Sequence, residues 1–376
     1  MHILIVIHSL GRGGAERVTA HLSRLWVAAG HRVTIATISA GGGYYGVDPS
    51  VRVVALGLAR DGRGIIDAAL GNLRRMRAIR ALIRDLKPDV TIGMMTTVSV
   101  LVALAGLGLP SRTLGAQRIY PPCLPLGRPW TLLRKYVFGL LDVVITQTEM
   151  ASAWLRTHTY ARRFVTIPNA VEWPLPENEP AILPAAILAP SLKLILAAGR
   201  LEPQKGFVHL IRAFDHLRRV GENWGLVILG EGRERAALES RVRALGLERR
   251  VFLPGAAGNI MDWYKRASLF VLSSLCEGFP NALLEAMAAG VPVVSFDCDT
   301  GPRELIRHGV DGMLVPVGDE TALAKSMGAL MNDERLRVEM AGHAIAVRER
   351  FSKERVLALW DEAFKAACGT RSVARE

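Results

Sequence analysis

Residues 268–290 have the sequence Ser268-Leu-Phe-Val-Leu-Ser-Ser-Leu-Cys-Glu277-Gly-Phe-Pro280-Asn-Ala-Leu-Leu-Glu285-Ala-Met-Ala-Ala-Gly290, which predicts a strand, a loop and a helix. The apolar run at its start is typical of a buried strand. Pro280 suits the first helical position, and Gly290 ends the helix before the next strand at Val291–Phe296. The segment therefore predicts one strand-helix-strand unit of a parallel sheet.

Two carboxylates flank this loop. Glu277 is expected in the loop and Glu285 on the helix, with seven residues between them. In the segment Gly278–Asn281, the backbone N–H groups of the residues other than Pro280 are expected at the helix N-terminus, where the helix dipole favours an anion such as a diphosphate. Carboxylates accept hydrogen bonds from sugar hydroxyls, so the segment suits a sugar nucleotide. An ordinary strand-loop-helix with two surface glutamates is the alternative.

The length of 376 residues and the apolar content of 50% predict a folded chain with two domains. Strand-like runs alternate with helical ones, which is typical of an α/β fold with doubly wound parallel sheets. We expect a Rossmann-like N-terminal domain at 1–172, a proline-rich linker at 173–192, a Rossmann-like C-terminal domain at 193–350 and a last helix at 351–376.

Residues 90–111 contain no charged side chain and are long enough to cross a bilayer. Polar and glycine residues break the run, so we expect a short strand at Val90–Met94 and a buried helix at Ser99–Ala105 instead. The first residues lack the basic start, apolar stretch and cleavage site of a secretory signal. We therefore expect a cytoplasmic protein.

The formal net charge of +12 lies in the N-terminal half. Residues 1–172 hold 21 Lys and Arg against 9 Asp and Glu, whereas residues 173–376 hold 26 of each. Two basic amphipathic stretches, 73–87 and 128–138, predict peripheral binding to anionic lipid at the inner face of the plasma membrane. Solvated helices that cover the sheet are the alternative. Nucleic acid is not expected, because no nucleic-acid-binding motif accompanies the charge.

A second motif lies upstream at Gly199-Arg200-Leu-Glu-Pro-Gln-Lys205-Gly206. Together with Glu277-Gly-Phe-Pro and Glu285, it resembles the retaining glycosyltransferases of family 4, and the resemblance covers nearly the whole chain. It implies the GT-B fold, in which two Rossmann-like domains face each other across a cleft and the last helix, at 351–376 here, returns to the N-terminal domain. It also implies that Arg200 and Lys205 bind the diphosphate of a nucleotide-sugar donor, Glu277 the sugar hydroxyls and Glu285 the ribose hydroxyls. Gly278, Phe279 and Asn281 complete this expected donor site.

The chemistry of these side chains suits a transfer without a metal. A guanidinium and an ammonium stabilise the negative charge that develops on a leaving diphosphate, so Arg200, Lys205 and Glu277 are the expected catalytic residues. The resemblance implies no protein nucleophile, because the leaving phosphate itself is proposed to take the acceptor proton. No cofactor and no metal is expected, although Asp297-Cys-Asp299 resembles a metal-binding pair.

Two features of the N-terminal half are candidates for substrate contact. The glycine-rich turn Ser9-Leu-Gly11-Arg12-Gly13-Gly14-Ala-Glu16-Arg17 resembles the family's first loop, which implies that Gly13 and Gly14 face the donor phosphates or the reacting sugar. Many relatives have a histidine after the fifth strand, where this chain has Arg118. Arg118 could bind acceptor or donor phosphate, and a plain surface arginine is the alternative.

We therefore expect a retaining hexosyl or N-acetylhexosaminyl transferase that uses a nucleotide-diphosphate sugar, with UDP favoured, and a glycan acceptor. The likeness to bacterial polysaccharide and glycan-assembly enzymes, including N-acetylgalactosaminyl transferases, favours a polyprenyl-diphosphate-linked acceptor. Two alternatives remain: a nucleotide-sugar epimerase of the same fold, and a non-catalytic partner subunit that binds a sugar nucleotide or lipid.

Overall fold

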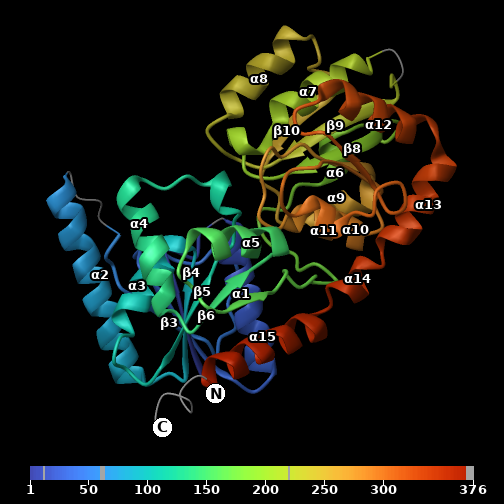
Figure 1. The fold of residues 1–376 in the computed structure, drawn as a ribbon. Coiled ribbons are helices and arrows are strands. Elements are labelled where there is room, and N and C mark those ends of the chain that lie inside the picture. Colours follow the sequence, from blue (N-terminus) through green and yellow to red (C-terminus); the bar gives the residue numbers. More distant parts are fainter. Residues whose placement is uncertain (12, 60–63, 219–220, 370–376) are drawn as a thin grey trace. The chain divides into compact units, whose positions relative to one another are not determined.

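The computed structural model describes residues 1–11, 13–59, 64–218 and 221–369. The chain divides into two compact units. Unit 1 contains Met1–Asn169 and the segment from Lys353 onward, and unit 2 contains Ala170–Ser352. Each unit has a parallel sheet with helices on both faces (Figure 1).

Unit 1 is built on a seven-stranded sheet with the order β3-β2-β1-β4-β5-β6-β7. Its strands are β1 (His2–Ile7), β2 (Arg32–Thr37), β3 (Arg52–Ala55), β4 (Val90–Met94), β5 (Arg112–Ala116), β6 (Val143–Thr146) and β7 (Phe164–Thr166). Its helices are α1 (Gly14–Ala28), α2 (Ile65–Leu86), α3 (Thr96–Ala105), α4 (Arg128–Val137), α5 (Glu149–His158) and α15 (Lys353–Cys368), with short turns η1 (Pro121–Cys123) and η2 (Phe138–Leu140). The strand order reverses between β1 and β4, so the sheet is doubly wound.

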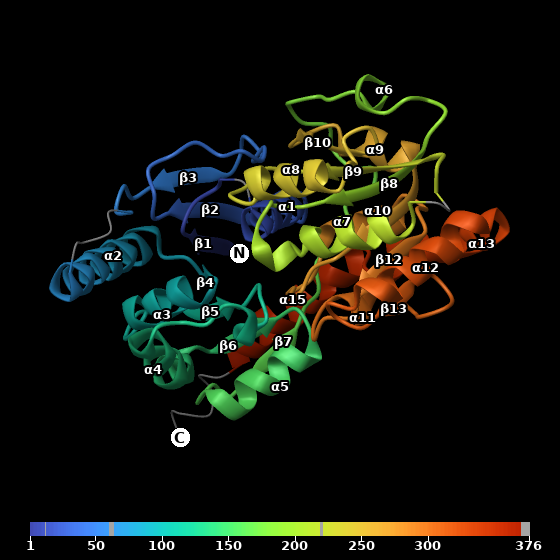
Figure 2. The same cartoon turned by 90° about the horizontal axis from the view of Figure 1, so that it is seen from above.

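Different helices cover the two faces of this sheet. Leu4 and Val6 on β1 pack with Ile79 of α2 and with α3, and these two helices lie side by side in Figures 1 and 2. Because successive side chains of a strand point to opposite faces, the apolar side chains on the other face must be buried by other helices. There α15 packs on α1 through Trp360 and Trp26, whose rings are 5.1 Å apart and nearly perpendicular. The last helix is thus part of the core of unit 1.

The uncharged segment 90–111 forms β4 and α3, as predicted. Gly93 allows the helix to pack closely on the strand, because a Cβ there would lie 2.6 Å from the Cα atom of Ser99. Ser99 Oγ donates to the carbonyl oxygens of Gly93 and Met95 at 2.8 Å. Within the described ranges, none of the helices has the length and apolarity needed to cross a membrane.

Unit 2 has a six-stranded parallel sheet with the order β10-β9-β8-β11-β12-β13. Its strands are β8 (Lys193–Ala198), β9 (Trp224–Leu229), β10 (Val251–Gly255), β11 (Ala267–Leu272), β12 (Val293–Phe296) and β13 (Met313–Val315). Its helices are α6 (Pro184–Ile187), α7 (Phe207–His216), α8 (Arg235–Ala244), α9 (Ile260–Arg266), α10 (Asn281–Ala288), α11 (Pro302–Leu305), α12 (Glu320–Asn332), α13 (Glu334–Ala344) and α14 (Val347–Arg350), with a 3-10 turn η3 (Pro203–Lys205).

The two faces of this second sheet are also covered separately. Side chains of α7, α8 and α12 form the core on one face, and side chains of α9, α10 and α14 form the core on the other. The strand order reverses between β8 and β11. The predicted α/β class, with two doubly wound Rossmann-like domains, is therefore confirmed.

Two helices begin at residues other than the predicted ones, and the first is α3, which starts at Thr96 instead of Ser99. Helix α10 begins at Asn281, and Pro280 is its extended N-cap residue rather than its first residue. Residues 334–350 form two helices, α13 and α14, rather than one continuous helix. Ala346 N–H bonds to the carbonyl of His343, three residues back, instead of four. This tighter turn interrupts the α-helical ladder.

Residues 173–192, expected as a linker, lie within unit 2. Leu175 and Leu188 are 5% and 1% exposed and belong to its core. The Asn259 side chain accepts from Ile182 N–H at 2.8 Å and donates to its carbonyl at 3.1 Å. The apolar residues between the prolines thus bind this segment to unit 2, and the division falls at Asn169.

Candidate functional site

The carboxyl ends of β8 and β11 are neighbours at the point where the strand order of unit 2 reverses. Open α/β sheets bind ligands outside the carboxyl ends of their strands at such a point. The loop after β8 contains Arg200 and Lys205, and the loop after β11 contains Glu277. The fold therefore brings two distant motifs to one edge of the sheet.

Lys205 and Glu277 form an ion pair at this edge. Lys205 Nζ donates to Glu277 Oε1 at 2.6 Å, and the two side chains are 19% and 8% exposed. Both backbones are anchored: Ser273 Oγ donates to the Lys205 carbonyl at 3.0 Å, and Thr300 Oγ1 donates to the Glu277 carbonyl at 2.5 Å. The ammonium and the carboxylate are therefore held at fixed positions in a largely shielded place.

Glycines allow the loops of this edge to approach closely. Gly230, after β9, has a φ of +144°, and a Cβ there would overlap the carbonyl oxygen of Gly199. Gly206 has a φ of +61°, and a Cβ there would overlap the carbonyl oxygen of Ser273. A larger residue at either position would force the loops apart and strain the backbone. Gly206 thus helps to place Lys205 beside Glu277.

Arg200 lies on the same loop as Lys205 and is exposed. Its side chain makes no hydrogen bond or ion pair within the part of the chain that the structure describes. Other arginines of unit 2, such as Arg235 and Arg303, are paired with carboxylates. A guanidinium without a protein partner is available to bind two oxygens of a phosphate.

Glu285 is 5% exposed and lies on α10. The hydroxyl of Tyr264 donates toward Glu285 Oε2 at 3.2 Å and lies 3.0 Å from the carbonyl oxygen of Ala282. Tyr264 could not be predicted as a neighbour of Glu285 from the sequence, because α9 has no local signal that connects it to α10. Of the other predicted donor-site residues, Gly278 and Phe279 are buried, and Asn281 is half-buried at the start of α10.

Gly13 and Gly14 lie in unit 1, at the carboxyl end of β1 and beside the strand-order reversal of that sheet. Gly13 is the N-cap residue of α1, and a Cβ there would overlap the carboxylate of Glu16. Gly14 has no neighbouring atom within 4 Å of a Cβ position, so ligand atoms can approach it. Arg12, in the same turn, lies outside the described residues.

Arg118 lies two residues beyond β5 and is only 9% exposed. The interpretation as a surface arginine is therefore wrong. Its Nη2 donates to Asn169 Oδ1, which also accepts from Gln147 Nε2 at 2.9 Å. Burial lowers the pKa of Arg118 to about 10, so the guanidinium is still charged at neutral pH. Gln147 and Asn169 were not among the predicted site residues, because they follow two other strands, β6 and β7.

Asp297 accepts two hydrogen bonds from Arg303, at 3.0 Å to Nε and 3.0 Å to Nη2. Among the described residues, no group of three or more histidine, cysteine or acidic side chains is arranged to hold a metal ion. Between the two aspartates, burial and then the charge of Glu277 raise the pKa of the Cys298 thiol to about 12. Cys298 is therefore a neutral neighbour of the Lys205–Glu277 pair at neutral pH.

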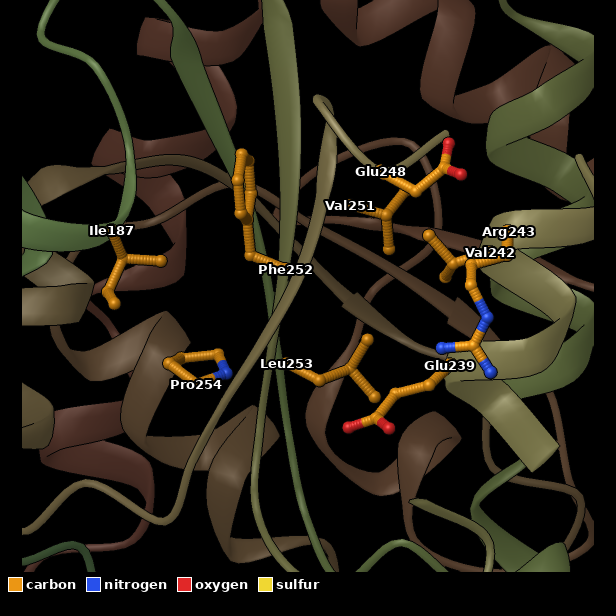
Figure 3. Close-up of a pocket in the computed structure, with 9 residues that line it drawn as sticks. All are labelled: Ile187, Glu239, Val242, Arg243, Glu248, Val251, Phe252, Leu253 and Pro254. Carbon is orange, nitrogen blue, oxygen red and sulfur yellow. The ribbon is translucent and has the colours of Figure 1, made fainter. Parts of the chain in front are cut away.

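A separate groove of about 320 Å³ lies along the edge strand β10 (Figure 3). Phe252 and Leu253 point to opposite sides of this strand. The residues that line the groove are Ile187, Glu239, Val242, Arg243, Glu248, Val251, Phe252, Leu253 and Pro254. None of the predicted donor-site residues is among them, so we do not assign the groove to this site.

Comparison with known families agrees with the two-unit division. Residues 13–170 match the model described as a glycosyl transferase 4-like domain. Residues 184–346 match the model described as glycosyl transferases group 1. The chain belongs to the group 1 glycosyltransferase family. The predicted family and its GT-B fold are therefore confirmed.

This group 1 glycosyltransferase is 28% identical over 345 residues to an α-1,4-N-acetyl-D-galactosaminyltransferase of Campylobacter jejuni, and the match covers 92% of each chain. It is 34% identical over 302 residues to an exopolysaccharide phosphotransferase of Streptomyces coelicolor, a match that covers 79% of this chain and 30% of that protein. Among solved structures, HepE of Anabaena in complex with UDP-glucose has a TM-score of 0.77 and 19% identity, and covers 97% of this chain and 100% of HepE.

Proposed function

We propose that the protein is a retaining glycosyltransferase that moves a hexose or an N-acetylhexosamine from a UDP-sugar to a glycan acceptor, in the biosynthesis of surface polysaccharide or another glycan. The main supporting observation is the ion pair between Lys205 and Glu277 at the strand-order reversal of unit 2, with Arg200 unpaired on the same loop within the described structure. Membership of a glycosyltransferase family agrees with this assignment.

Each side chain has one role in the proposed donor site. Arg200 and Lys205 bind the diphosphate, Glu277 accepts a hydrogen bond from a hydroxyl of the donor sugar, and Glu285 accepts from the ribose. The remaining proposed donor contacts come from Gly278, Phe279 and Asn281 in unit 2 and from Gly13 and Gly14 in unit 1.

The proposed transfer breaks the bond between the anomeric carbon and the diphosphate oxygen, and the electron pair leaves with the diphosphate. The acceptor hydroxyl oxygen forms the new bond on the same face, and its proton passes to the departing phosphate. No protein nucleophile is required. Lys205, which Glu277 holds in place before the reaction, stabilises the developing negative charge without having to reorganise, and Arg200 adds a second positive charge.

The names of similar proteins favour the donor and acceptor classes. The Campylobacter relative is named for transfer to a GalNAc-containing glycan on undecaprenol diphosphate, and HepE was solved with UDP-glucose. We infer by analogy that this protein uses a UDP-sugar and a polyprenyl-diphosphate-linked glycan, and that it works at the cytoplasmic face of the membrane.

The proposal is tested by incubating the purified protein with radiolabelled UDP-sugars and a polyprenyl-diphosphate-linked glycan. We expect the label to enter the acceptor, and NMR of the product to show the anomeric configuration of the donor. An isomerised donor without transfer would indicate the nucleotide-sugar epimerase instead. Binding of UDP-sugars without transfer of the label or isomerisation of the donor would indicate the non-catalytic subunit.

We also propose that unit 1 binds an anionic membrane surface through α4. Leu132 and Tyr136 on this helix are each 56% exposed, and Tyr160 beside it is 57% exposed. Lys135 Nζ lies 5.8 Å from the ring centres of both tyrosines. A basic surface with exposed aliphatic and aromatic side chains suits the headgroup region of a bilayer.

The double variant Leu132→Asp/Tyr136→Asp should lower binding to vesicles that contain phosphatidylglycerol by about tenfold or more, because two apolar side chains no longer enter the interface. Vesicle flotation measures the bound fraction. Leu183→Asp is the matched control, since Leu183 is 65% exposed in unit 2. Equal binding of the wild-type protein and the double variant would contradict a membrane role for α4.

A further inference from the structure

Arg118, Gln147 and Asn169 come together at one edge of unit 1. They follow β5, β6 and β7, which are neighbouring strands of a parallel sheet. All three side chains are buried, with 9%, 5% and 4% of their surfaces exposed. The carboxyl ends of neighbouring parallel strands are where α/β proteins bind their ligands, so this cluster occupies a ligand-binding position in the fold.

The charge of Arg118 has no counter-ion in the described structure. Its partner, Asn169, is a neutral amide. Arg112, at the other end of β5, shows the usual arrangement: its guanidinium lies 3.3 Å from the carboxylate of Asp142, with the side chains 12% and 21% exposed. Buried charges in proteins are normally paired, so a counter-ion for Arg118 is expected to come from elsewhere.

The hydrogen bonds of the cluster leave a defined set of groups for a ligand. Asn169 Oδ1 accepts from both Arg118 Nη2 and Gln147 Nε2, which fixes the orientation of both side chains. Arg118 Nε and Nη1 and Gln147 Oε1 have no hydrogen-bond partner among the described residues. The neighbouring Gln117, by contrast, uses both ends of its amide, with Thr96 Oγ1 and the carbonyl of Ile119.

We propose that Arg118, Gln147 and Asn169 form a phosphate-binding subsite, in which Arg118 Nε and Nη1 bind phosphate oxygens and Gln147 Oε1 accepts from an adjacent hydroxyl of the same substrate. The subsite deepens the proposed function, and therefore rests on it. The phosphate belongs either to the diphosphate of the donor or to the diphosphate of the lipid-linked acceptor. The chemistry of recognition is the same in both cases, because a guanidinium binds phosphate oxygens through paired N–H groups.

The empty subsite should destabilise the folded protein. Burial of an uncompensated charge disfavours folding, and this effect also lowers the pKa of Arg118. Replacing Arg118 with methionine removes the charge but keeps a long side chain in the same space. We therefore expect Arg118→Met to melt at the same temperature as the wild type or higher. Arg112→Met breaks an ion pair and should melt lower.

Steady-state kinetics distinguish the two sources of the phosphate. Arg118→Met should raise the KM of one substrate by about 10- to 100-fold, the usual effect of losing charge-assisted hydrogen bonds to a ligand. A higher KM for the UDP-sugar identifies the donor diphosphate, and a higher KM for the acceptor identifies the acceptor diphosphate. Arg118→Lys should recover part of the loss, and Arg112→Met should change neither KM.

Binding of inorganic pyrophosphate, measured by calorimetry on the full chain, does not depend on turnover. We expect Arg118→Met to bind pyrophosphate at least about tenfold more weakly than the wild type and than Arg112→Met. The subsite is overturned if Arg118→Met binds pyrophosphate like the wild type with both KM values unchanged, or if it melts lower while keeping wild-type affinity. A protein that binds pyrophosphate through Arg118 but transfers no sugar would refute the proposed function and leave the subsite intact.

Discussion

Glu277→Gln is expected to lower kcat/KM by about 10²- to 10³-fold, because the variant loses a charged acceptor that contacts the donor sugar in the transition state. Glutamine has nearly the same shape, so the loop after β11 should keep its path through the bond from Thr300 to the Glu277 carbonyl. The variant also loses the carboxylate that fixes Lys205 at 2.6 Å. Steady-state kinetics with varied UDP-sugar would measure both effects.

Asp311→Asn is the matched control for this variant. Asp311 is fully buried, and its carboxylate lies 2.6 Å from Arg307, so the geometry of the pair is similar. Asp311 precedes β13 and so lies at the amino end of a strand, whereas the site lies at the carboxyl ends of β8 and β11. Asp311→Asn should lower the melting temperature but leave kcat/KM unchanged. Normal turnover of Glu277→Gln on the correct donor would refute the role of Glu277.

Lys205→Met is expected to lower both stability and activity. The ammonium is the ion-pair partner of a carboxylate that is 8% exposed, and removing one partner of a buried pair typically costs about 3–5 kcal/mol of unfolding free energy. The same change removes one of the two cations proposed to bind the leaving diphosphate, so kcat should fall by about 10²-fold or more. Thermal unfolding and single-turnover kinetics would measure the two effects separately.

The double variant Lys205→Met/Glu277→Gln separates these effects. It leaves neither charge of the pair behind, so it should regain much of the thermal stability that Lys205→Met loses. It should nevertheless stay inactive, since both groups are absent from the donor site. If the double variant regained activity together with stability, the role of Lys205 would be structural only.

Much of the fold could be predicted from local sequence patterns. Strand β4 has the bounds predicted from its apolar run, and the polar and glycine residues within 90–111 correctly indicated a strand and a helix rather than a membrane span. The packing of 173–192 on unit 2 could not be predicted, because it depends on Asn259 in a distant segment. The proline content of this segment indicated irregular structure, but an irregular segment can still pack on a domain, as this one does on unit 2.

The site residues could be predicted where a sequence motif directly follows a predicted strand. Glu277 was expected in the loop after a strand, and the sheet order places Lys205, in the loop after β8, at the neighbouring strand end. Their direct ion pair is a tertiary contact that no local pattern predicts. The hydrogen bonds from Tyr264 to Glu285 and from Arg118 to Asn169 could not be predicted either, because each joins residues of different helices or strand ends.

A crystal structure of the protein with a bound UDP-sugar would test the proposed donor site. Arg200 and Lys205 should lie within hydrogen-bond distance of the diphosphate, with Glu277 on a hydroxyl of the sugar and Glu285 on the ribose. A structure in which these four side chains point away from the bound nucleotide sugar would contradict the proposed site.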